Sequence, residues 1–280
     1  MQLEIPERTQ YIRTIVDELT RVASHLLAWA CMCMDMGALT SFIYGMRDRE
    51  KIVEIFEETC GGRLIMNYNV IGGVMYDVGP NFQRKIKEFI PYMRKMLKEY
   101  HQIFTGNIIA KERMIGIGVL TKEQAISYAV TGPSGRASGF SCDLRKYRPY
   151  AAYDKVKIEE VLRYEGDSFA RYMNRLDEIP QSLDILEQLV DNIPEGDYAV
   201  KTKGIIRIPE GEYYEMVEAP RGIFGVYINS KGDKSPYRVK FRPPCLSLVS
   251  IVDPISRGEK IADLIAIGGS LDYVVPDIDR

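Results

Sequence analysis

Asp35 is the residue of this 280-residue sequence whose setting points most directly to chemistry. It is the only formally charged side chain between residues 22 and 46. A carboxylate among apolar residues costs free energy unless a partner charge, hydrogen bonds or protonation compensates it. Asp35 is therefore a candidate for proton delivery. The alternative is a structural core aspartate that caps a neighbouring helix or pairs with Arg21, Arg47 or Arg49.

The two histidines give weaker signals. His25 lies ten residues before Asp35. On a continuous helix the two residues would be about 15 Å apart, at about 1.5 Å rise per residue, so they cannot form a direct pair. We expect His25 to be a structural hydrogen-bonding residue, and His101, beside Lys98 and Glu99, to lie at the surface.

Arginines stand among small residues in the segment GPSGRASGFSCDLRK, residues 132–146, which contains Arg136, Asp143 and Arg145. Small residues allow a backbone or a rigid ligand to come close, and arginine offers planar, permanently charged donors. One interpretation is a phosphate-binding loop, although the GxxxxGK[ST] spacing is absent. The other is a buried network of arginine and aspartate that holds a long loop in place.

The cysteines argue against a metal site and against disulfides, because none of the five belongs to a CxxC motif. Cys31 and Cys33 would project about 200 degrees apart on a helix, so we expect small core residues. Unpaired cysteines favour a reducing, intracellular setting. A formal net charge of -2 provides no basic field for nucleic acid. The residues alone predict no metal ligand and no cofactor bound by this chain.

Long helices must position these residues. Apolar side chains recur at three- and four-residue spacing and predict helices over 7–29, 47–59 and 80–104, with a kink at Pro91. The stretch 22–46 could imitate a membrane span, but we favour a buried bundle helix, since an aspartate at mid-membrane costs about 2.5 to 3.5 kcal/mol. A capping box starts a short helix at Thr121, and 156–190 is predicted helical with a break near Pro180.

After Pro194 the pattern changes to strand-like alternation. Strands are predicted over 214–218, 222–229 and 237–242, and a closing helix over 258–267. The expected fold class is α+β, mostly α. It comprises a helical bundle over 1–196 and a small β-rich C-terminal lobe over 197–280, either as two units or as one integrated domain.

Seven ordered segments resemble the large quinone-site subunit of respiratory complex I, the 49-kilodalton-type or D-type large subunit of NADH:quinone oxidoreductase. The segments are ERTQYIRTIVDELTRVASHLLAWA, MDMGALTSFIYGMRDREKIVEIFEETCGGRL, NYNVIGGV, GRASGFSCDLRKYRPYAAYD, EGDSFARYMNRLDEI, EAPRGIFGVY and IADLIAIGGSLDYVVPDIDR. The resemblance covers essentially the whole chain, and the family's N-terminal region is expected to lie outside it.

The resemblance implies a fold like that of the nickel–iron hydrogenase large subunit. It also implies a peripheral position on the cytoplasmic face of the cell membrane, within a membrane-bound complex. Quinone would be the substrate, and an iron–sulfur cluster in a partner subunit would supply electrons. Other peripheral-arm and membrane-arm subunits would be partners, and quinone reduction would be coupled to proton or sodium translocation.

The same resemblance assigns site residues. Asp35 matches the aspartate of the D-[LM]-G-A motif, which hydrogen-bonds a histidine that protonates the reduced quinone. Residues expected near the cavity, or near the cluster of the partner, are His25, Arg136, Asp143, Arg145, Tyr273 and Val275.

The proton-donating histidine and a partnering tyrosine belong to the family's N-terminal region, so this chain alone is expected to be inactive. A separate polypeptide that supplies them is one arrangement. Two alternatives stay open: a membrane-bound hydrogenase-like large subunit without metal ligands, and a non-catalytic scaffold fragment. NADH, a reduced deazaflavin and ferredoxin are equally compatible electron donors at this stage.

Overall fold

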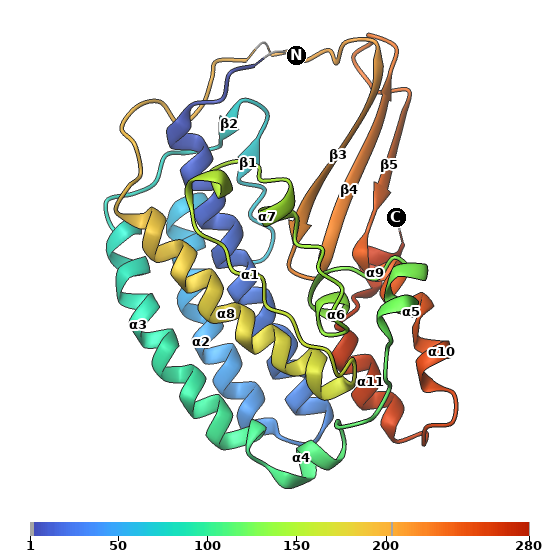
Figure 1. Ribbon diagram of the computed structural model, residues 1–280. Helices are drawn as coiled ribbons and strands as arrows, with labels where there is room; N and C mark the ends of the chain where they lie inside the picture. Colours follow the sequence, from blue (N-terminus) through green and yellow to red (C-terminus); the bar gives the residue numbers. More distant parts are fainter. Residues whose placement is uncertain (1–2, 203, 280) are drawn as a thin grey trace.

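Four long helices form a bundle on one side of the molecule, and the sheet and C-terminal helices lie on the other (Figure 1). The computed structural model describes residues 3–202 and 204–279. The bundle helices are α1 (Glu7–Asp35), α2 (Leu39–Cys60), α3 (Phe82–Tyr100) and α8 (Ser168–Val190). Helix α1 packs against α2 and α8, and α3 packs against the same two helices. Their apolar stripes form the main core, in which Ile15, Leu19 and Leu26 are fully buried.

The expected single helix across residues 22–46 is wrong. Helix α1 ends at Asp35, and α2 begins at Leu39. Between them Gly37 has φ +90°, the Ala38 N–H donates to the Cys33 carbonyl (2.8 Å), and the Gly37 N–H donates to Met34 (2.9 Å). This is a Schellman-type ending, which requires a left-handed residue that glycine supplies without strain. Among the described residues, none of the helices combines the length and hydropathy needed to cross a bilayer.

The predicted helix over 156–190 is only partly correct. Residues 156–167 are irregular, and α8 begins at Ser168 and continues through Pro180 without a break. The irregular segment runs along α8 and bonds to its side chains: Lys157 N–H donates to Gln188 and Glu159 N–H to Gln181. A proline removes one helical donor, but burial of Ile179 and Leu183 on either side holds this helix together.

The C-terminal lobe contains a three-stranded antiparallel sheet in the order β3-β4-β5 (Figure 1). The strands are β3 (Gly211–Ala219), β4 (Gly222–Ser230) and β5 (Arg238–Arg242), which confirms the three predicted strands. The closing helix is shifted to α11 (Asp263–Leu271), and three further short helices follow β5: α9 (Pro244–Ser250), α10 (Val252–Ser256) and α12 (Val275–Ile278). The mostly helical α+β class is therefore confirmed. The boundary between residues 196 and 197 stays a prediction.

Short elements join these parts. They are β1 (Asn69–Val70), β2 (Gly73–Val74), the π-helix η1 (His101–Thr105), α4 (Ile108–Glu112), α5 (Lys122–Ser127), α6 (Gly132–Arg136), α7 (Leu144–Tyr147) and the 3₁₀ turn η2 (Tyr153–Lys155). The capping box of Thr121 with Gln124 is confirmed. Helix α11 packs on both α1 and α8, so the C-terminal segment is joined to the end of α1 that carries Asp35.

Candidate functional site

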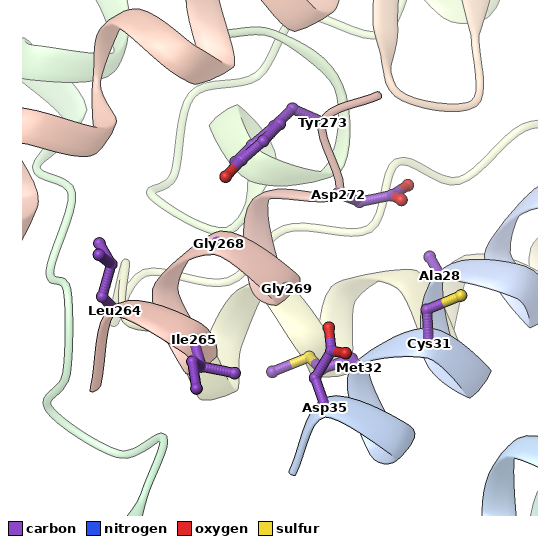
Figure 2. Close-up of a pocket in the computed structure, with 10 residues that line it drawn as sticks. All are labelled: Ala28, Cys31, Met32, Asp35, Leu264, Ile265, Gly268, Gly269, Asp272 and Tyr273. Carbon is purple, nitrogen blue, oxygen red and sulfur yellow. The ribbon is translucent and has the colours of Figure 1, made fainter. Parts of the chain in front are cut away.

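A pocket of about 540 Å³ lies between the last turns of α1 and helix α11 with the segment after it. Figure 2 shows its lining: Ala28, Cys31, Met32, Asp35, Leu264, Ile265, Gly268, Gly269, Asp272 and Tyr273. Gly269 of α11 faces the last turn of α1, since a Cβ at that position would lie 3.4 Å from the Met32 side chain and 3.8 Å from the Asp35 carboxylate. The pocket is therefore built from residues more than 200 positions apart in the sequence.

Asp35 is the last residue of α1 and is exposed, so the expectation of a buried carboxylate is wrong for this chain. Its pairing with Arg21, Arg47 or Arg49 is also wrong: Arg21 bonds to Glu18 and Arg47 to Asp48. Within the described residues Arg49 forms no ion pair and no hydrogen bond. The reason is the early end of α1, which brings Asp35 out of the bundle. A carboxylate at the negative end of a helix dipole is unfavourable, so helix stability does not explain the aspartate at this position.

Asp272 provides a second carboxylate in the same pocket, and arginines fix its position. It ends α11 in the left-handed conformation (φ 56°). Arg221 donates to the Asp272 carbonyl (2.8 Å) and to its Oδ1 (3.0 Å). Arg175 donates to the carbonyls of Ser270 (2.5 Å) and Leu271 (3.0 Å), and its Nε lies 3.9 Å from Asp272 Oδ2. These arginines satisfy the last carbonyls of α11 and hold the pocket wall rigid.

The remaining polar groups of the pocket are the Tyr273 phenol and the Cys31 thiol (Figure 2). Burial, followed by the nearby Asp272 and Asp35, raises the pKa of the Cys31 thiol, so it stays protonated. Ala28, Met32, Leu264 and Ile265 provide apolar walls. Apolar walls that also carry a few polar groups suit a lipid-soluble ligand with a polar head that exchanges protons.

Away from this pocket, Arg136 joins two buried carboxylates. Its Nε donates to Glu178 and its Nη1 to Glu218, both at 2.8 Å. The other oxygen of Glu178 lies 2.9 Å from His25 Nε2. Although burial alone would raise the pKa of Glu178, Arg136 and His25 hold it well below its usual range. Burial lowers the pKa of His25, which favours the neutral imidazole.

Arg145 forms the second half of this network. It donates to Asp143 (2.6 Å) and to Glu18 (3.1 Å), and Glu18 also accepts from Tyr153 (2.6 Å) and Arg21 (3.3 Å). All five side chains are buried. The network ties α1, α6, α7, α8 and β3 together, as the interpretation of the 132–146 segment as a buried network predicts. The phosphate-loop interpretation is wrong, since these arginines are already paired with carboxylates.

The predicted site residues therefore separate into groups. Asp35 and Tyr273 both line the pocket. The buried network contains His25, Arg136, Asp143 and Arg145. Val275 is exposed at the start of α12, outside the pocket lining. His25 has the structural role expected for it, and Cys33 is buried, but Cys31 is a pocket residue rather than core filler.

Sequence reasoning missed the partners of the network, Glu18, Glu178 and Glu218, and it missed Asp272 as a pocket residue. One signal was available on α8. Arg171, Arg175 and Glu178 recur at spacings of four and three residues beside the apolar positions, which places all three charges on one buried helix face. Within residues 3–202 and 204–279, no three Cys, His, Asp or Glu side chains lie close enough to hold a metal ion.

The sequence matches known proteins along its whole length. It is 64% identical over all 280 residues to the C/D polypeptide of the NADH-quinone oxidoreductase of Phocaeicola vulgatus, covering 54% of that protein. It is 44% identical to the D polypeptide of the same enzyme from Geobacillus kaustophilus, covering 76% of it. The chain thus spans about half the length of the C/D relatives and about three quarters of the separate D relatives.

A solved structure has the same fold. A chain of the membrane-bound sulfane sulfur reductase, an archaeal respiratory membrane complex, matches with a TM-score of 0.95 and 37% identity, over 99% of this chain and 77% of that one. The family model described as "Respiratory-chain NADH dehydrogenase, 49 Kd subunit" matches residues 35–207 and 201–280. This chain belongs to the family of the 49-kilodalton subunit of respiratory-chain NADH dehydrogenase.

Proposed function

We propose that this chain forms part of the quinone-reducing cavity of an NADH:quinone oxidoreductase. The observation that supports it best is the pocket whose apolar walls also carry Asp35, Asp272 and Tyr273. Reduction of a quinone to a quinol takes two electrons and two protons. A quinone needs an apolar site for its ring and tail, and proton-exchanging groups near its carbonyl oxygens.

Each pocket residue has a role in this proposal. Asp35 holds or relays a proton at the end of α1, directly or through an imidazole supplied by another part of the complex. The Tyr273 phenol donates a hydrogen bond to a carbonyl oxygen of the quinone. Asp272, which accepts a hydrogen bond from Arg221, keeps the end of α11 in place. Met32, Leu264 and Ile265 contact the ring and exclude water from it.

The chain works inside an assembly in this proposal. An iron–sulfur cluster in a partner subunit supplies the electrons, and membrane-arm subunits couple the reduction to ion translocation. The chain itself is peripheral, at the cytoplasmic face of the cell membrane. Exposed apolar side chains beside the pocket, Met34 and Leu39, support contact with further subunits or lipid there.

The test is an Asp35→Asn variant in the intact complex. We expect NADH-dependent quinone reduction to fall on the order of a hundredfold, as for loss of a general acid or base, while the complex assembles normally and its clusters remain reducible by NADH. Asp233→Asn, an exposed aspartate in the turn after β4, is the matched control and should leave turnover unchanged. Full turnover in the Asp35→Asn complex would remove Asp35 from the mechanism.

A second candidate acceptor is sulfane sulfur, because the structurally similar chain belongs to a membrane-bound sulfane sulfur reductase. The same preparations distinguish the two. The quinone proposal is supported if the wild-type complex reduces quinone but not polysulfide, and if Asp35→Asn lowers that quinone reduction. The reverse pattern supports the sulfur candidate.

A further inference from the structure

Arg49 lies in a second pocket without any partner. This pocket, about 280 Å³, is formed where α1, α2, the loop after α2 and the β3–β4 turn meet. Within the described part of the chain, Arg49 forms no ion pair and no hydrogen bond, and its Nε is shielded from solvent. The buried Nε donor of Arg49 is therefore unsatisfied, and its permanent charge has no counter-charge although the side chain is half-buried.

The other cations of this pocket are already occupied, which singles out Arg49. Arg63 is paired with Glu50 and Glu57. Arg221 uses its Nε and Nη2 on Asp272 and its Nη1 on Ser24. Since Ser24 accepts that bond through its oxygen, its own hydroxyl hydrogen remains available. The donors that remain free in this pocket are therefore the Arg49 guanidinium and the Ser24 hydroxyl.

Thr20 also lines the pocket, and its hydroxyl donates to the Val16 carbonyl. The remaining lining is apolar and includes Ala23, Leu27, Val53, Phe56, Met66 and Pro220. At its rim Leu64 is 79% exposed and the next residue, Ile65, is 87% exposed. A single free cation favours a monoanion over a phosphate, which carries nearly two charges. Apolar walls favour an anion on a hydrocarbon stem. An arginine surrounded by apolar side chains is typical of the centre of a protein–protein interface.

We infer that this pocket receives an acidic side chain of a neighbouring protein subunit, whose carboxylate binds Arg49 while Leu64 and Ile65 cover the contact. The inference rests on the proposed place of the chain in a multisubunit complex and adds a docking point distinct from the quinone pocket. Its test measures subunit association and not turnover, so the two proposals fail separately.

The first experiment compares two charge reversals on α2 in the complex purified with all its subunits. Arg49→Glu places like charges together, and we expect recovery of the other subunits with this chain to fall on the order of tenfold at moderate salt. Lys51→Glu is the matched control. Lys51 is exposed on another side of the same helix and lines a different pocket, so recovery should stay unchanged. Equal recovery of both variants overturns the inference.

The second experiment identifies the occupant. Arg49→Lys keeps the charge and introduces an amine that a carbodiimide joins only to a carboxylate in direct contact. We expect a cross-link from position 49 to an aspartate or glutamate of another subunit, located by mass spectrometry of the complex. Coupling only to residues of this same chain, such as Glu50, or no coupling at all, overturns the inference. If the pocket instead holds a phosphate or a lipid headgroup, no coupling at all is expected.

Discussion

Removing the charge of Glu18 should destabilise the protein in a way that depends on pH. Burial alone would raise the pKa of Glu18, but Arg21 and Arg145 outweigh burial and hold it at about 2, below the ordinary value of 4.5. That difference corresponds to about 3 kcal/mol of native-state stabilisation, at about 1.4 kcal/mol per pKa unit. Breaking a buried ion pair costs about 3 to 5 kcal/mol, which is the same range.

Glu18→Gln preserves the shape of the side chain and can still accept the bond from Tyr153. Arg145 would keep Asp143, and Arg21 would keep its bond to the Glu218 carbonyl. Because the folded-state pKa of Glu18 is lowered, its contribution is fully present above pH 4.5 and is lost as the pH falls towards 2. We therefore expect the variant to lose about 3 kcal/mol of unfolding free energy at pH 7 and only about 1 kcal/mol at pH 3.

Urea denaturation provides the assay, followed by the fluorescence of Trp29, the single tryptophan, which is buried in the bundle. Wild type and variant are compared at both pH values. Glu54→Gln, an exposed substitution on α2, is the control and should change the free energy of unfolding by less than about 0.5 kcal/mol at either pH. A loss in Glu18→Gln that is equal at pH 7 and pH 3 would refute the electrostatic explanation and leave only packing.

Two further predictions concern Asp17 on α1 and the close contact between α6 and β4. Burial, followed by the adjacent Glu18, raises the pKa of Asp17 to about 6, so the folded state loses stability as the pH rises from about 4 through 6. Asp17→Asn should therefore be more stable than wild type by on the order of 1 kcal/mol at pH 8, with no gain at pH 4, in the same urea assay. At Gly132 (φ +68°) an added Cβ would lie 2.5 Å from the Gly222 Cα, so Gly132→Ala should cost about 2 to 5 kcal/mol. Gly61→Ala has a similar φ of +72° but open space around it, and should cost only about 1 to 2 kcal/mol in thermal or urea unfolding; equal losses in the two glycine variants would show that the overlap is relieved.

The sequence predicted those parts of the fold in which local pattern and tertiary packing agree. The stripes of α1 and α3, the capping box at Thr121 and the three strands all follow from periodicity or turn chemistry within a few residues. The predictions were wrong where contacts between residues far apart in the sequence determine the backbone conformation. Residues 156–167 have helical composition, but side chains of α8 bind the backbone of Lys157 and Glu159, and the segment is irregular.

The candidate site was predictable only in part for the same reason. Asp35 stands out as a lone charge in an apolar run, but that run does not reveal that Gly37 ends the helix and exposes the carboxylate. Pairing of Arg136 with Glu178 and Glu218 depends on three separate elements meeting. The spacing of residues within one segment does not show which segments come into contact. The sequence therefore indicated the network partners only through the charged stripe on α8.

The buried charge network also constrains how the chain reaches its native state. Arg21 bonds to the Glu218 carbonyl across 197 positions, His25 to Glu178 across 153, and Glu18 to Arg145 across 127. During synthesis at about 5 to 20 residues per second, roughly 10 to 40 s pass between the appearance of residue 21 and that of residue 218. Over that interval α1 has its apolar partners in α2 but no complete set of counter-charges. The network therefore cannot close until β3, the last of its elements along the chain, has been synthesised.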